Sequence, residues 1–278
     1  MPLNLELIGK KTEPTPFTYN QDSVILYALG VGAGVDELDF VYEKNLKVLP
    51  TFAVIPILPS MGPLMKNSGI NMPAVLHGEQ KIILHAAIPD AGTLYSVGEW
   101  ESVYDKGDKG AVLNFGFQTY DQEDRLVFEN KIVIVDRSAG NFGGDRGPKG
   151  EKIDPPEGKQ ADFSVTYAIS KDQAALYRLS GDKNPLHVDP EFAKKGKLPA
   201  PILHGLCTYG HAGRAILHSV CDGEPSKLKS FAARFMNVVF PGETITVDGW
   251  KRETGGVVIQ VKAGDGRLIL GNALAELA

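Results

Sequence analysis

The sequence of 278 residues lacks most of the features that mark secreted, membrane-spanning or nucleic-acid-binding proteins. It has only two cysteines, Cys207 and Cys221, which do not form a disulfide framework and fit a reducing compartment. No apolar run approaches the ~18 residues that span a bilayer, and the first six residues, MPLNLE, lack the apolar core of a secretory signal. The net charge of −5 argues against nucleic acid as the main partner, because binding phosphates requires clustered cations.

The most informative stretch is YRLSGDKNPLH, from Tyr177 to His187. It places a carboxyl (Asp182), an amide (Asn184) and an imidazole (His187) within six residues. Because Pro185 biases the residue before it toward extended geometry, we predict that the three lie on an irregular turn. An acid and a base held side by side suit proton transfer. An Asp after Gly is also common in ordinary turns, so it is the complete motif that favours a catalytic pair.

A second segment begins with His204 and Gly205 and continues as the small-residue run GLCTYGHAG. We predict a long helix over about 202–220, buried and wrapped by a sheet, because each of its glycines costs ~1 kcal/mol relative to alanine unless packing compensates. His204, His211 and His218 recur every seven residues. Successive histidines would lie ~10 Å apart on such a helix, too far to share a metal ion.

Shorter helices are predicted on either side of the motif. Ser170 to Gln173 is interpreted as a capping box that starts a helix ended by Gly181. Asp189 is predicted to cap a second helix that ends at Gly196.

The chain is predicted to contain two copies of one plan, in residues 1–140 and 161–278, with a linker over 141–160 that is rich in Gly, Pro and charge. YALGVG from Tyr27 aligns with YRLSGD from Tyr177, and GTLYSVGEW from Gly92 aligns with GETITVDGW from Gly242. Each copy has a helical part followed by alternating strands, with turns at 121–124 and 264–266. The expected fold class is therefore α+β.

The first copy departs from the motif. Gly32 stands where the acid should be, and no histidine follows within ten residues. Pro56, Pro59 and Pro63 interrupt its helical run. We therefore expect one active site per chain, in the second copy.

The segments YRLSGDKNPLH and PILHGLCTY, the latter starting at Pro201, resemble the 2-enoyl-CoA hydratase 2 family of the MaoC-like group, the hydratase module of peroxisomal multifunctional enzyme type 2. VLHGEQ, from Val75, extends the resemblance into the first copy. The resemblance implies a double hot-dog fold, in which two antiparallel sheets each wrap a helical segment and the long central helix is intact only in the C-terminal half. It also implies a hydro-lyase of fatty acid β-oxidation that hydrates trans-2-enoyl-CoA to (3R)-3-hydroxyacyl-CoA.

The residues match the demands of this reaction. Water must lose a proton as it attacks C3, a proton must reach C2, and the thioester oxygen needs a donor. His187 is the expected base, since imidazole titrates near neutral pH, and Asp182 is the expected acid or orienter, although the pair can share these roles. Asn184 is expected to support them. The Gly205 N–H, at the start of the predicted helix, is the expected oxyanion donor.

The resemblance further implies that His77, Gly78, Lys106 and Phe235 contact coenzyme A. Coenzyme A is part of the substrate, so neither a separate cofactor nor a metal is expected. The chain is expected to form a homodimer, and acyl-CoA is expected to be the small molecule that it binds as substrate. Peroxisomal residence follows from resemblance alone, because the terminal AELA is not a peroxisomal address; otherwise the expected location is cytoplasmic.

Alternative functions are a hot-dog acyl-CoA thioesterase, a 3-hydroxyacyl-ACP dehydratase, or a non-catalytic acyl-CoA binding module.

Overall fold

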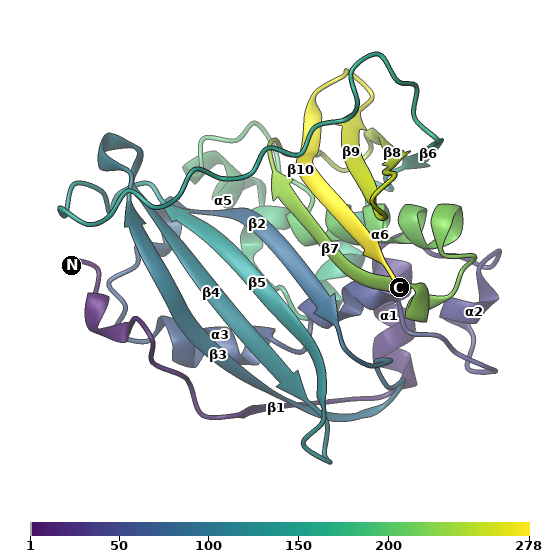
Figure 1. The fold of residues 1–278 in the computed structure, drawn as a ribbon, viewed down its shortest axis with the longest axis horizontal. Helices are drawn as coiled ribbons and strands as arrows, with labels where there is room; N and C mark the ends of the chain where they lie inside the picture. Colours follow the sequence, from purple (N-terminus) through teal and green to yellow (C-terminus); the bar gives the residue numbers. More distant parts are fainter. Residues whose placement is uncertain (1) are drawn as a thin grey trace.

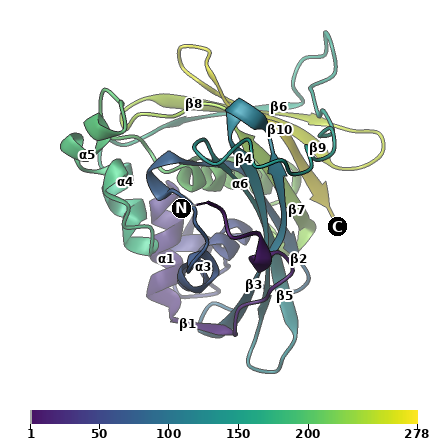
Figure 2. The ribbon, with the colours of Figure 1, turned by 90° about the vertical axis from the view of Figure 1, so that its left-hand side faces the viewer.

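A computed structural model describes residues 2–278 and shows one antiparallel sheet of ten strands with the helices gathered on one side of it (Figures 1 and 2). The strands are β1 Thr15–Tyr19, β2 Val75–Leu84, β3 Gly92–Asp105, β4 Ala111–Tyr120, β5 Leu126–Asp136, β6 Phe163–Ala168, β7 Leu228–Phe235, β8 Thr244–Lys251, β9 Val257–Ala263 and β10 Leu268–Leu277. The helices are α1 Gln21–Gly30, α2 Leu38–Val41, α3 Leu58–Met65, α4 Gln173–Tyr177, α5 Pro190–Lys195 and α6 Gly205–Val220. Short 3-10 helices are η1 Leu5–Leu7, η2 Pro50–Val54, η3 Met72–Ala74, η4 Gly107–Lys109, η5 Arg178–Ser180, η6 Pro185–His187 and η7 Pro225–Lys227.

The strand order is the same in both halves of the chain. It runs β1-β3-β4-β5-β2 in the first half and, read from the opposite edge, β6-β8-β9-β10-β7 in the second. The two halves meet where β2 pairs with β7, with Ile82 opposite Phe231. The α+β class is therefore confirmed, and the two expected sheets are joined edge to edge into one.

Alternation of buried and accessible residues explains the strands. β3, β4 and β5 bury nearly every second side chain, as a sheet with one covered face requires. The turn between β4 and β5 has Asp124 at φ 58°, and the turn between β9 and β10 has Gly266 at φ 87°. Both positions need the left-handed backbone that Asp and Gly tolerate best.

Helix α6 is the central element of the second half and is buried from Cys207 to Leu217. It tolerates its glycines because neighbouring segments approach them closely: a Cβ on Gly210 would lie 2.4 Å from Val31 Cγ1, and one on Gly213 would lie 2.5 Å from Thr51 Cγ2. The helix starts at residue 205, later than predicted, because Leu203 lies outside it and donates its N–H to the Val239 carbonyl. The packing nevertheless confirms the buried helix.

The corresponding part of the first half is broken, as its prolines predict. A 3-10 turn begins at Pro50, and the short helix α3 follows with Pro59 in its first turn and Pro63 inside it. The predicted capping box at Ser170 is wrong. Ser170 Oγ accepts from the Asp172 N–H, and the Gln173 side chain donates instead to carbonyls at the end of α1, including Gly30 at 2.6 Å. Asp189 does cap α5, accepting from the N–H groups of the first turn.

The segment 141–160 crosses the sheet as an extended trace between the two halves (Figure 1). Its Ile153 N–H donates to Asn272 Oδ1 at 2.7 Å. Within residues 2–278, no helix combines the length and apolar character needed to cross a membrane.

Candidate active site

The turn that carries Asp182 and His187 is built by its own side chains. Helix α4 and the following 3-10 turn end at Gly181, whose φ of 145° favours glycine. Asp182 Oδ1 accepts from the Asn184 N–H at 3.0 Å, and Asn184 Oδ1 accepts from the Leu186 N–H at 3.0 Å. These two side-chain turns bring the chain back so that His187 points inward while Asn184 stays exposed.

His187 is held in one tautomer. Its Nδ1 lies 2.8 Å from the Ile202 carbonyl, and since a carbonyl only accepts, Nδ1 carries the hydrogen. The neutral ring therefore has its lone pair on Nε2. Burial lowers the pKa of His187, while the Ile202 hydrogen bond and the Asp182 charge oppose the shift. The side chain is in its basic form at neutral pH.

His204 joins this pair, although the sequence had suggested no chemical role for it beyond its place at the start of the second segment and in a stripe of histidines. Its ring stacks on His187 with centroids 3.6 Å apart and planes 25° apart. Its Nε2 lies 3.3 Å from the Asp182 carbonyl. The sequence feature that could have identified His204 is its place in PILHGLCTY, immediately before Gly205.

Asp182, His187 and His204 each offer a ligand-type atom within 4.8 Å of the others. A metal bound by both histidines would have to lie in both ring planes, about 2.1 Å from each nitrogen. Rings stacked 3.6 Å apart and tilted by 25° do not meet at that distance. The arrangement of these three groups suits proton transfer better than metal binding.

Gly205 places a free backbone donor beside this cluster. The N–H groups of Cys207 and Thr208 donate to the His204 carbonyl, so the Gly205 N–H precedes the helical ladder. Gly205 is exposed, and a Cβ at this position would lie 3.1 Å from Phe235 Cε1. The positive end of the α6 dipole would stabilise negative charge on an oxygen atom placed next to this N–H.

Three of the four predicted coenzyme A residues lie at the β2–β7 junction next to Gly205. His77 packs on Phe235 with ring centroids 4.7 Å apart, and its Nε2 donates to the Glu79 carbonyl at 3.1 Å. Gly78 lies in a bulge of β2. Burial, the largest effect, lowers the pKa of His77 to about 4, so its ring is neutral.

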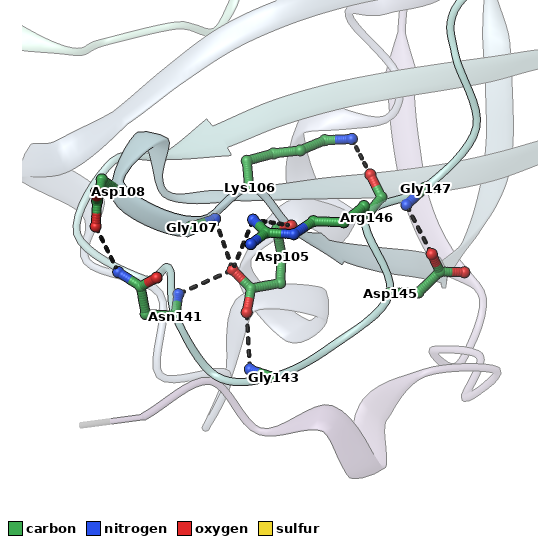
Figure 3. A network of polar contacts seen from close by, with 9 residues as sticks. All are labelled: Asp105, Lys106, Gly107, Asp108, Asn141, Gly143, Asp145, Arg146 and Gly147. Carbon is green, nitrogen blue, oxygen red and sulfur yellow. Dashed lines mark hydrogen bonds and ion pairs between the residues drawn. The ribbon is translucent and has the colours of Figure 1, made fainter.

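Lys106 lies apart from this group. Its neighbour Asp105 ends β3, and Val75 begins β2 near His77; these two residues are separated across the sheet by three strand spacings, about 14 Å. The Lys106 ammonium donates to the Arg146 carbonyl and lies 5.5 Å from the Tyr104 ring centre. Figure 3 shows it in a network organised by Asp105, which accepts from the N–H groups of Gly107, Asn141 and Gly143. Contact of Lys106 with coenzyme A stays a prediction.

A cavity of about 660 Å³ lies elsewhere, between the N-terminal segment, the end of α3 and residues 138–142. None of its lining residues belongs to the histidine cluster.

Within residues 2–140, the structure shows no equivalent cluster at the matching position of the first half. Gly32 has a φ of 81°, and a Cβ there would lie 2.6 Å from His211 Nε2. Helix α6 of the second half thus occupies the space beside Gly32.

Two different family models match the two parts of the chain. Residues 152–271 match the model of the MaoC like domain, and residues 17–138 match that of the MFE-2 hydratase 2 N-terminal domain. The 3-hydroxyacyl-thioester dehydratase Y of Mycobacterium tuberculosis is 41% identical, covering 99% of each chain. The probable enoyl-CoA hydratase 2 of Dictyostelium discoideum is 38% identical, over 97% of this chain and 95% of the relative.

Among solved structures, full-length peroxisomal multifunctional enzyme type 2 from Drosophila melanogaster superposes with a TM-score of 0.81 at 35% identity. The match covers 96% of this chain and 48% of that longer protein.

Proposed function

The chain belongs to the MaoC-like family with the hydratase 2 arrangement, and from that premise we propose that it is an (R)-specific enoyl-CoA hydratase. It adds water to trans-2-enoyl-CoA and yields (3R)-3-hydroxyacyl-CoA, a step of fatty acid β-oxidation. The observation that carries this proposal is the tautomer of His187. With Nδ1–H committed to the Ile202 carbonyl, the Nε2 lone pair is free beside Asp182.

The reaction follows from this geometry. Water held between Asp182 and His187 gives a proton to His187 Nε2 as its oxygen attacks C3. Negative charge that develops on the thioester oxygen is stabilised by the Gly205 N–H. A proton from the pair then reaches C2, so the pair returns to its starting state and one water has been added. Asn184 supports the pair indirectly, through the turn that its side chain closes.

The reverse reaction uses the same groups. A 3-hydroxyacyl thioester would lose water through the same transition state, which fits the relative named as a dehydratase. A thioesterase would instead need water to attack the thioester carbonyl and would release a free thiol. Comparing kcat/KM for substrates bound to coenzyme A with kcat/KM for the same substrates bound to acyl-carrier protein distinguishes a coenzyme A hydratase from a carrier-protein dehydratase.

Other properties are part of the same proposal. Coenzyme A enters as part of the substrate, with His77, Gly78 and Phe235 lining its path and Lys106 as an outlying contact. No separate cofactor and no metal are required by the steps above. A peroxisomal location is supported by relatives with peroxisomal names, and a homodimer is testable by light scattering.

The test is enoyl-CoA hydration followed by loss of the conjugated absorbance, with chiral analysis of the product. Asp182→Asn and His187→Gln should each lower kcat by about 10²–10⁴-fold, the usual contribution of general acid–base catalysis. Asp189→Asn is the matched control, because Asn caps a helix as well as Asp does. Near-full activity in either site variant, a (3S) product, or thiol release without hydration would contradict the proposal.

A further inference from the structure

We propose that His204 is a positioning residue that holds both members of the reacting pair, His187 through its ring face and Asp182 through its backbone. This inference rests on the proposed function, since it assigns His204 a task within that site. His204 is 1% exposed and lies at the residue before α6, so its ring is fixed by the chain on both sides.

The contacts of His204 are complementary. One ring nitrogen reaches the Asp182 carbonyl at 3.3 Å, and the ring stacks on His187 at 3.6 Å. The Tyr177 ring packs against it with centroids 4.8 Å apart. Tyr177, Asp182 and His187 belong to the motif, whereas His204 lies 17 residues after it, so its ring links the motif to the start of α6.

The tautomer of His204 follows from its partners. Nε2 faces a carbonyl and must carry the hydrogen, which leaves Nδ1 as a buried acceptor without a hydrogen-bond partner in the structure. Protonating Nδ1 would bury a second N–H without an acceptor and place a charge against His187. The ring therefore stays neutral.

The charged and titratable groups around His204 support this neutral state. Burial is the largest of the effects that lower the pKa of His204 to about 4, and the charges of His187 and Arg178 act in the same direction. Asp182, through its charge and its carbonyl, acts in the opposite direction. Tyr177 stays protonated, because burial raises its pKa well above the ordinary value.

Two consequences for catalysis follow. The ring covers one face of His187 and keeps water from it, which helps to hold His187 in its basic form. The Nε2–H fixes the Asp182 backbone, and through it the carboxyl, at the distance needed for a shared water. Small displacements of reacting groups can cost about 10²-fold in rate, so a residue with both contacts affects turnover more than substrate binding.

Two substitutions separate these contacts. His204→Phe keeps an aromatic ring on His187 but removes the donor to the Asp182 carbonyl. His204→Gln keeps a donor at the ε position but removes the ring. We expect His204→Phe to lower kcat by about 10-fold or more with KM within about twofold and an unchanged acid limb of the pH profile. We expect His204→Gln to move the acid limb upward, toward the unperturbed imidazole pKa of about 6.5.

His85 provides the control, because it is a half-exposed histidine whose Nε2 lies 2.8 Å from the Glu129 carboxylate, away from the reacting pair. His85→Phe and His85→Gln should leave kcat and the pH profile unchanged. Circular dichroism of every variant gives the folded fraction. A loss of activity in both His204 variants that matches the loss of folded protein, with an unmoved pH profile, would overturn the inference, as would wild-type kinetics in both.

A measurement without turnover keeps this result apart from the proposed function. Nitrogen-15 chemical shifts of the imidazoles in the wild-type chain report the tautomer of His204 and the pKa of His187. Hydrogen on His204 Nε2, together with a His187 pKa that rises in His204→Gln, supports the inference even in a protein that hydrates no enoyl thioester. Hydrogen on Nδ1 of His204 would refute it in a fully active enzyme.

Discussion

Glu37→Gln tests whether a buried ion pair joins the first half of the chain to α6. The Arg214 guanidinium donates to both carboxylate oxygens of Glu37 and, through Nη1, to the Val31 carbonyl at 2.8 Å. It also lies 5.0 Å from the centre of the Tyr167 ring. The side chain of Arg214 is 4% exposed and that of Glu37 is 18% exposed. Removing the carboxylate therefore leaves a cation that water hardly reaches.

The expected cost follows from this burial. Removing one partner of a buried pair costs about 3–5 kcal/mol. Glu37 is partly open to solvent, which reduces the estimate to about 2–3 kcal/mol of the free energy of unfolding. At roughly 2–4 °C per kcal/mol for a chain of this size, the melting temperature should fall by about 4–12 °C.

Urea unfolding followed by circular dichroism measures this change. Glu224→Gln is the matched control, because Glu224 binds Lys47 at 2.8 Å on the surface, where ion pairs contribute about 0–1 kcal/mol. The double variant Glu37→Gln/Arg214→Met should recover part of the loss, since no cation is left buried. A Glu37→Gln midpoint equal to that of Glu224→Gln would refute the reasoning.

The pKa of Glu37 determines how the stability difference between wild type and Glu37→Gln changes with pH. Burial alone would raise the pKa of Glu37, but hydrogen bonds and charge from His218 and Arg214 bring it below its ordinary value. The stability that Glu37 contributes is therefore fully present above the unfolded pKa of about 4.3 and is lost as the pH falls through the lowered folded pKa. Wild type and Glu37→Gln should converge in stability at acidic pH.

Two further predictions concern packing and the linker. Gly213→Ala should destabilise the protein by up to about 2 kcal/mol in urea, because the added Cβ would lie 2.5 Å from Thr51 Cγ2 and an overpacking cost of about 1–3 kcal/mol outweighs the gain of ~1 kcal/mol in helix propensity; a stabilised variant would contradict this. Asp105→Asn should lower the melting temperature at neutral pH, because Asp105 accepts from three backbone N–H groups. The Gly107 N–H is the largest of the effects that lower its pKa to about 2 (Figure 3). This contribution is present above the unfolded pKa of about 3.9 and is lost as the pH falls toward 2, so a melting difference that persisted near pH 2 would contradict the assignment.

Local sequence features predicted much of the architecture. The period-2 alternation in strands β3–β5 and β8–β10 depends only on side chains near in sequence, and so do the turns at Asp124 and Gly266. The prolines of the first half predicted its broken helix, because their ring conflicts with helical geometry wherever the chain lies. The capping box at Ser170 failed because Gln173 had a partner in α1, a contact that no local rule includes.

The sequence by itself determined which residues could act: an acid, an amide and an imidazole on one turn, with a glycine at the start of a later helix. Only the tertiary structure decided how they act together. Pairing of β2 with β7 brings His77 of the first half to Phe235 of the second, and the fold of α6 stacks His204 on His187. Patterns of hydrophobicity and turn residues act over a few positions of the chain, whereas these contacts join residues that meet only when the whole sheet has closed around α6.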